Sequence, residues 1–144
     1  MIANKRATRI LEDRQVDVKL KLSALWIVLM FLYIYADILG FYTPETLVGL
    51  LSGEAGGVQI TETFLIVMAI WMAVPSIMVL LSLTLEARAN RWANLIVGVI
   101  SAVVLVATFF AGQISLRYAF HAAVEAVLIA LIIWNAWKWP NAEG

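Results

Sequence analysis

The stretch FLIVMAIWMAVPSIMVLLSL at residues 64–83 decides the fold, because it holds no charged side chain over its whole length. A helix rises about 1.5 Å per residue, so about 20 apolar residues cross the roughly 30 Å hydrocarbon core of a membrane. Three further stretches of similar length and mostly apolar composition occupy residues 22–41, 92–110 and 116–137. We therefore predict an all-α bundle of four transmembrane helices.

The composition of the whole chain agrees with this prediction. Of its 144 residues, 63% are hydrophobic and 14% are charged, whereas soluble domains average roughly 45–50% and about 25%. A soluble enzyme and a disordered tail are both excluded, and the lipid bilayer is the expected partner. Ten Lys and Arg balance ten Asp and Glu, so no net charge attracts nucleic acid. The absence of cysteine excludes disulfides and thiolate metal sites.

The chain divides into a polar N-terminal arm at residues 1–21, one transmembrane domain at residues 22–140 and a short tail at residues 141–144. Most basic side chains lie in the arm, between the second and third apolar stretches, or after the fourth: Lys5, Arg6, Arg9, Arg14, Lys19, Lys21, Arg88, Arg91 and Lys138. Since Lys and Arg concentrate in cytoplasmic segments, we expect both termini in the cytoplasm. Tryptophans favour the membrane interface, and we expect five on the cytoplasmic side: Trp26, Trp92, Trp134, Trp137 and Trp139.

The first outer loop carries a helix-start signal at Thr43-Pro44-Glu45: a capping hydroxyl, a proline at the first helical position and an acid in the first turn. Apolar residues follow at amphipathic spacing, namely Leu47, Val48, Leu50 and Leu51. We predict a short helix on the outer membrane surface, ended by Ser52-Gly53 and Gly56-Gly57. It would be either a lid over a site or a simple cover for the bundle end. Thr61 is expected to cap the second span.

Small residues predict where helices pack closely. The third stretch contains Gly98-x-x-x-Ala102, and the fourth contains Ala119, Ala122, Ala123, Ala126 and Ala130. Small side chains let membrane helices approach one another. We expect the third and fourth helices to pack tightly, against each other or across a homo-oligomer interface.

Three ionisable residues within the apolar stretches, Asp37, His121 and Glu125, are the candidate site. A charge near mid-bilayer costs about 2.5–3.5 kcal/mol, so such residues usually face protein or water and usually have a function. His121 and Glu125 are four residues apart and therefore share one helical face. That face extends toward the outer surface through Arg117 and Tyr118.

On the first stretch, Tyr33 lies one helical turn from Asp37 on the same face. If the first and fourth helices are neighbours, an outward-facing pocket gathers these six residues, with Gln59 and Glu62 at its rim.

The chemistry of this pocket stays open. Histidine titrates near neutral pH, so the group of residues could pass protons. The pocket could also bind a small ligand or a cation. A single histidine is a generic ligand set, and we assign no metal and no cofactor. Acid–base catalysis on a lipophilic substrate is an alternative that no motif selects. Another alternative is a non-catalytic accessory subunit of a larger membrane complex, in which an Asp37–Arg117 or Glu125–His121 contact only holds helices together. Binding or transfer of a small ligand, cation or proton is the leading hypothesis.

Three phrases carry a resemblance to a known family: Ala36-Asp37-Ile38, the expected loop Asn90-Arg91-Trp92-Ala93-Asn94, and Ala136-Trp137-Lys138-Trp139. With them, residues 20–140 resemble a bacterial family of small four-helix membrane proteins of unknown function. The resemblance implies four helices in a bacterial cytoplasmic membrane. It implies no activity.

Overall fold

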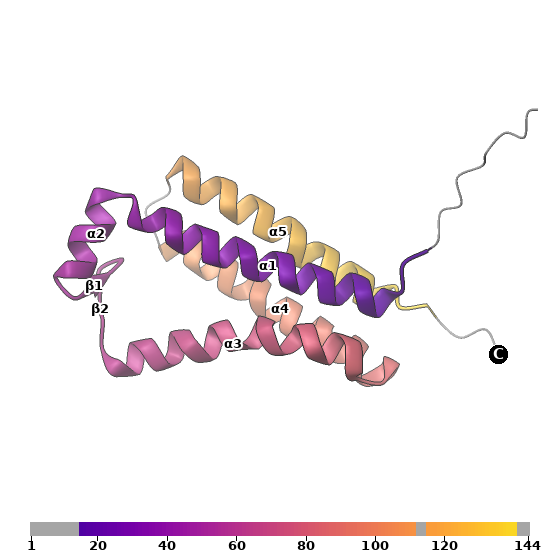
Figure 1. Cartoon of the computed structure of the whole chain (residues 1–144). Coiled ribbons are helices and arrows are strands. Elements are labelled where there is room, and N and C mark those ends of the chain that lie inside the picture. The colour runs from indigo at the N-terminus through magenta and orange to yellow at the C-terminus, as the bar shows by residue number, and fades with distance from the viewer. Residues whose placement is uncertain (1–14, 112–114, 141–144) are drawn as a thin grey trace, which may run out of the picture.

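The computed structural model describes residues 15–111 and 115–140, and its elements are almost entirely helical (Figure 1). In chain order they are α1 (Val18–Phe41), α2 (Pro44–Leu51), β1 (Glu54–Ala55), β2 (Val58–Gln59), α3 (Glu62–Thr84), α4 (Ala87–Ala111) and α5 (Leu116–Trp137). Four of the helices, α1, α3, α4 and α5, are long and apolar enough to cross a membrane. The predicted all-α fold with four such helices is confirmed.

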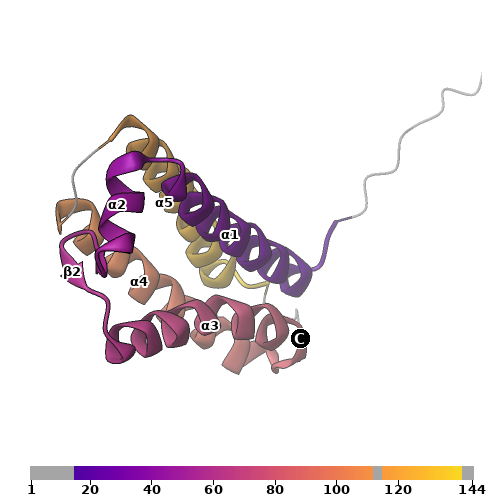
Figure 2. The same ribbon diagram turned by 60° about the vertical axis from the view of Figure 1, so that its left-hand side comes forward.

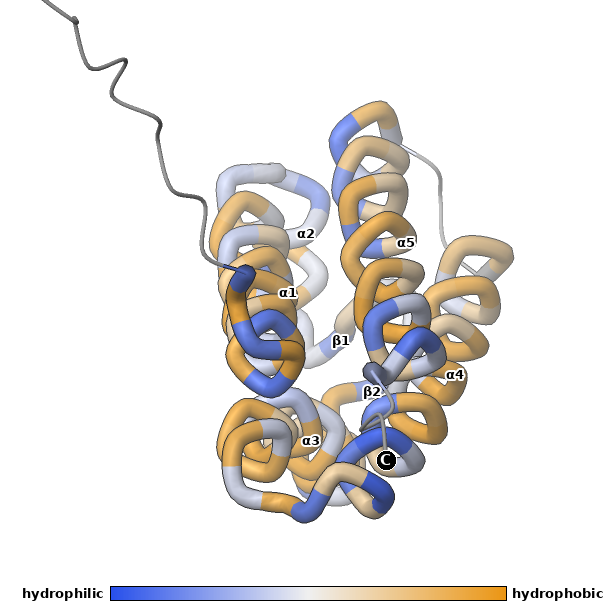
Figure 3. The backbone as a smooth tube through the Cα atoms, turned by 90° about the vertical axis from the view of Figure 1, so that its right-hand side faces the viewer, coloured by the Kyte–Doolittle hydropathy of each residue, from blue (hydrophilic) through white to orange (hydrophobic). Residues whose placement is uncertain are grey.

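The long helices share two common ends. α1 begins, α5 ends and α3 connects to α4 at one end, which we call the terminal end (Figure 1). The opposite end carries α2 and the small β1–β2 hairpin, and we call it the loop end. In Figure 3, hydrophobic residues extend along the long helices and hydrophilic residues gather at the terminal end.

Packing within the bundle is uneven. α3 packs on α1, α1 on α5 and α5 on α4, whereas α3 and α4 have little contact. From the terminal end to the loop end, α3 diverges from α1 and α5 (Figures 1 and 2). The loop-end half of α3 therefore has few partners in the chain, and its exposed apolar residues include Leu65, Ile66, Val67 and Ile70.

Two helices begin earlier than their apolar stretches predict. α1 begins at Val18 because Asp17 caps it, accepting a hydrogen bond from Lys19 N at 2.7 Å. α4 begins at Ala87, so the segment from Asn90 to Asn94 lies inside a helix. The prediction of a loop there was wrong. Polar residues can lie inside an apolar helix when side chains of neighbouring helices satisfy their hydrogen bonds, and the structure supplies such partners.

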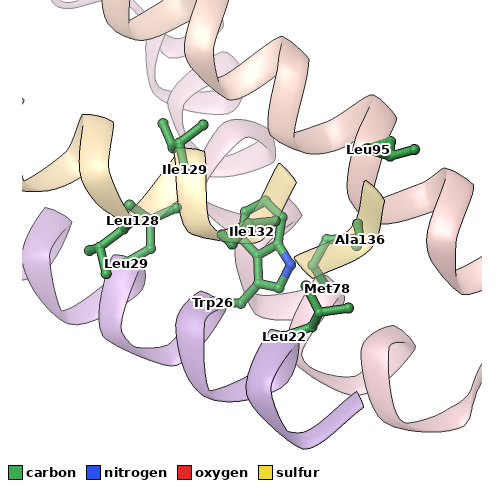
Figure 4. Packing of buried hydrophobic residues seen from close by; sticks show 9 residues of the cluster. All are labelled: Leu22, Trp26, Leu29, Met78, Leu95, Leu128, Ile129, Ile132 and Ala136. Atoms are coloured by element: carbon green, nitrogen blue, oxygen red, sulfur yellow. The ribbon is translucent and has the colours of Figure 1, made fainter. Parts of the chain in front are cut away.

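The apolar core lies toward the terminal end, since its α1 residues are in the first half of that helix and its α5 residues in the second half. Figure 4 shows its side chains from close by. It consists of Leu22, Trp26, Leu29, Met78, Leu95, Leu128, Ile129, Ile132 and Ala136. Trp26 is its largest member and is 0% exposed, so its ring packs inside the bundle, which the sequence did not predict. Its polar atom is satisfied inside the protein.

A buried polar network joins α1, α3 and α4 beside this core. Trp26 Nε1 donates to Asn94 Oδ1 at 2.7 Å, and Ser82 Oγ donates to the same oxygen at 3.3 Å. Asn94 Nδ2 donates to Asn90 Oδ1 at 2.7 Å, and Asn90 Nδ2 donates to Ser82 O at 2.6 Å. All four residues are 0% exposed. The network thus satisfies its polar side chains without solvent, as a membrane interior requires.

The predicted close approach of the third and fourth spans is confirmed within the chain. A Cβ atom on Gly98 of α4 would lie 2.9 Å from Ile133 Cγ1 of α5, closer than two carbon atoms can pack. Glycine at this position therefore lets α4 and α5 pack together.

The short helix predicted after Thr43 is confirmed as α2, with Pro44 in its first turn. Thr43 does not cap it through its side chain, contrary to expectation. The Gly56-Gly57 pair turns the chain between β1 and β2 with φ values of 58° and 82°, which glycine adopts readily. Thr61 caps α3 as predicted, because its hydroxyl accepts from Phe64 N at 3.1 Å.

Replacing Asn94 with alanine should lower the free energy of unfolding by about 1–3 kcal/mol, because the buried donors of Trp26 and Ser82 lose their common acceptor. The measurement is unfolding in mixed micelles with increasing denaturing detergent. Asn135→Ala is the matched control, since the Asn135 amide donates only to Leu131 O of its own helix. Equal stability of the two variants would contradict the importance of the network.

Candidate functional site

The structure places the candidate residues on two neighbouring helices. Tyr33 and Asp37 lie on α1, and Arg117, Tyr118, His121 and Glu125 lie on α5. α1 and α5 pack side by side along the bundle (Figures 1 and 2). The adjacency on which the predicted pocket depends is therefore present.

A cleft of about 400 Å³ opens between these helices at the loop end; we call it the loop-end cleft. It is lined from α1 by Ala36, Asp37, Gly40 and Phe41, from α5 by Arg117, Tyr118 and His121, and from the loop by Thr46, Leu50 and Ala55. Four of the predicted residues thus share one cleft. Residues of α2 and β1 form part of its wall.

Arg117 joins the cleft to the corner between α1 and α2. Its Nη1 donates to Ala36 O at 3.5 Å, and its Nη2 donates to Thr43 Oγ1 at 3.3 Å. Both bonds are long, and a guanidinium has five N–H donors. A Cβ atom on Gly40 would lie 3.8 Å from Nη1, so the side chain passes close to the backbone of α1. Arg117 therefore retains donor capacity for a ligand.

His121 is oriented by its own helix. Its Nδ1 lies 2.9 Å from Arg117 O, and because a carbonyl oxygen only accepts, this contact is a hydrogen bond in the tautomer that carries a proton on Nδ1. Nε2 then remains as a hydrogen-bond acceptor. The His121 ring also packs edge-on against Phe120, with 5.8 Å between the centroids.

Tyr118 occupies the side of the cleft next to α4. Its ring stacks on Phe109 of α4, with 6.2 Å between the centroids. This contact fixes the ring, and we expect Tyr118 to shape the cleft.

Tyr33 and Glu125 form a separate pair one turn deeper in the bundle. Tyr33 donates its hydroxyl proton to Glu125 Oε1 at 2.8 Å, and neither residue lines the loop-end cleft. The six residues expected in one pocket are therefore divided between a cleft and a deeper pair. His121 lies four residues before Glu125, the spacing by which a helix brings two side chains to one face.

The two residues expected at the rim lie elsewhere. Gln59 donates from Nε2 to Glu54 Oε1 at 2.7 Å, a contact within the β1–β2 hairpin. Glu62 lies in the first turn of α3, the helix that diverges from α1. Neither lines the loop-end cleft.

The loop-end cleft has a lining of mixed character. It combines one carboxylate, one guanidinium and one imidazole with apolar walls. Within residues 15–111 and 115–140, no group of three or more His, Asp or Glu side chains is arranged to hold a metal ion. The arrangement offers donors for an anionic group beside apolar surface for a small organic ligand.

The polar residues that sequence reasoning missed are Ser82, Asn90 and Asn94. The signal was the Asn90-x-x-x-Asn94 spacing, which places both amides on one helical face. It was missed because the segment was read as a loop. These residues hold helices together at the terminal end, far along the bundle from the cleft.

The Tyr33–Glu125 bond should contribute a measurable coupling between α1 and α5. In a double-mutant cycle of Tyr33→Phe and Glu125→Ala, we expect a coupling energy of about 0.6 kcal/mol, the average for such bonds in a membrane. Unfolding in mixed micelles supplies the free energies. Tyr35→Phe is the control, because Tyr35 on the same helix is 58% exposed; coupling as large between Tyr35 and Glu125 would contradict a specific bond.

Comparisons with known proteins identify a family without an activity. No curated protein and no solved structure gives a significant match to the chain. A family model described as "Family of unknown function (DUF6326)" matches residues 9–143, nearly the whole sequence. The expected membership of an uncharacterised family, with four apolar helices, is confirmed. The chain belongs to the DUF6326 family, whose function is unknown.

Proposed function

We propose that this protein is an integral membrane protein that binds a small ligand in the loop-end cleft. The observation that carries the proposal is the meeting of Asp37 from α1 with Arg117 and His121 from α5 in one cleft of about 400 Å³. Ligand sites commonly have volumes of about 300–1,000 Å³ and combine apolar walls with a few polar groups. The cleft has both properties.

The charged groups indicate the class of ligand. Arg117 makes two long hydrogen bonds, and its remaining donors fit a carboxylate or phosphate group. Asp37 would accept a hydrogen bond from an amine or hydroxyl of the same ligand. Phe41 and Leu50 supply apolar surface. A small organic molecule with one anionic group and one donor therefore matches the cleft best.

The orientation of the cleft follows from the basic residues. Lys19 and Lys21 in the first turn of α1, Arg88 and Arg91 in the first turns of α4, and Lys138 just after α5 lie at the terminal end. Arg117 is at the opposite end. The bias of Lys and Arg toward the cytoplasm supports a cytoplasmic terminal end and an outward-facing cleft in a bacterial cytoplasmic membrane.

Replacing Arg117 with glutamine should weaken ligand binding at least tenfold, about 1.4 kcal/mol. A panel of small carboxylates, phosphate esters and amino acids is first screened by thermal stabilisation of the detergent-solubilised protein. The affinity of a stabilising compound is then compared between wild type, Arg117→Gln and Asp37→Asn. Arg88→Gln is the control, since it removes the same charge at the terminal end.

Stabilisation by no compound, or equal affinity in Arg117→Gln and Arg88→Gln, would contradict the binding proposal. A proton leak in reconstituted vesicles that His121→Ala and Glu125→Gln abolish would instead favour proton transfer. Purification with one defined partner after mild solubilisation, with an empty cleft, would favour an accessory subunit.

The orientation can be tested with single cysteines, because the natural chain contains none. Ser52→Cys, next to α2, should react with a membrane-impermeant maleimide added to intact cells. Arg88→Cys should react only after the membrane is permeabilised. The reverse pattern would place the cleft on the cytoplasmic side and overturn the orientation.

A further inference from the structure

The start of α1 and the end of α5 lie side by side at the terminal end (Figures 1 and 2), and two clefts meet there. The first has a volume of about 310 Å³ and is lined by polar residues that include Gln15, Lys21, Asn135 and Lys138. We call it the polar cleft. It lies at the opposite end of the bundle from the loop-end cleft and shares no residue with it.

The second cleft, of about 310 Å³, runs along the same pair of helices. Its lining is Lys21, Ala24, Leu25, Val28, Leu131 and Asn135, and we call it the apolar groove. Lys21 and Asn135 line both spaces. The polar cleft and the apolar groove are therefore adjacent.

The groove runs along the helices toward the loop end. From Lys21 to Val28 on α1 a helix advances about 10 Å, and from Lys138 back to Leu131 on α5 it advances the same distance. One end of the combined space is thus cationic and polar, and the other end is apolar. This is the order of chemistry in a phospholipid, which has a phosphate at the interface and an acyl chain below it.

The charges in the polar cleft favour an anionic occupant. Two lysines line the cleft, Lys21 from α1 and Lys138 just after the end of α5. Asp17 also lines the cleft, but its carboxylate is directed back to its own helix, where it accepts from Lys19 N at 2.7 Å. Lys138 Nζ is held over the Trp134 ring, 4.1 Å from its centroid. A tryptophan and a lysine in this arrangement are typical of the headgroup level of a membrane.

We propose that the polar cleft and the apolar groove bind one anionic phospholipid, with its phosphate between Lys21 and Lys138 and an acyl chain along Ala24, Val28 and Leu131. Basic pockets between membrane helices bind anionic headgroups through the same combination of charge and shape. The proposal does not depend on a ligand in the loop-end cleft.

The test is native mass spectrometry of the full chain, released from micelles that contain equal amounts of phosphatidylglycerol and phosphatidylcholine. Wild type should retain one phosphatidylglycerol in preference to phosphatidylcholine. Lys21→Gln and Lys138→Gln should each reduce that retained fraction at least threefold, and together at least tenfold. Arg88→Gln should leave it unchanged, since Arg88 is a cation of the same end outside both clefts.

A second pair of variants separates a fitted lipid from general attraction to positive charge. Ala24→Phe fills the groove and keeps every charge, so it should also reduce retention at least tenfold. Ala130→Phe adds the same ring at an exposed position of α5 that lines neither cleft, and it should have no effect. Glycerol phosphate, which has a phosphate and no acyl chain, should compete only weakly.

Four results would overturn the proposal. They are equal retention of both lipids, an equal loss in Arg88→Gln and the two lysine variants, full retention by Ala24→Phe, and complete displacement by glycerol phosphate. The first two would indicate no lipid preference or diffuse electrostatic attraction. The last would indicate a phosphate site without a lipid.

Discussion

The constraint on which this structure depends is that side chains buried between its helices have no water to bond. Each buried polar group must find its partner in the protein, since an unpaired one costs several kcal/mol. The bond from Trp26 Nε1 to Asn94 Oδ1, at 2.7 Å, is the central example. It joins α1 to α4, and Ser82 adds α3 through the same oxygen. Three helices are thereby held in one register at the terminal end.

The two ends of the bundle consequently differ in character. The terminal end combines the apolar core with the buried network. At the loop end α3 diverges, and α1 and α5 enclose a cleft that contains ionisable side chains. The buried side chains of Trp26, Ser82, Asn90 and Asn94 bond one another, whereas Arg117 and His121 at the loop end retain donors and acceptors. This difference is the physical reason for proposing the site at the loop end.

Sequence patterns predicted the features that depend on a single helix. The four apolar stretches, the helix after Thr43-Pro44 and the Thr61 cap follow from local chemistry, and the structure contains them. Features that depend on a second helix were harder to predict. The segment around Asn90 was wrongly predicted to be a loop, and the burial of Trp26 was not predicted, because each side chain has a hydrogen-bond partner on another helix.

The same limit applies to the candidate site. Helical spacing placed Arg117, Tyr118 and His121 on one face, and the structure brings them to Asp37. Spacing could not predict that Tyr33 would bond Glu125 below the cleft, because this depends on the axial offset between α1 and α5. Nor could it predict that the hairpin would pair Gln59 with Glu54.

The hydrogen bonds of Arg117 have a thermodynamic consequence. Its guanidinium donates both to the end of α1 at Ala36 and to Thr43, the residue that precedes α2. An anion that draws the guanidinium away competes with those two oxygens. Binding of an anion in the cleft and the position of the corner between α1 and α2 are then linked equilibria. Linkage is reciprocal: whatever displaces α2 changes the affinity of the cleft by the same factor by which occupancy of the cleft changes the equilibrium for displacing α2.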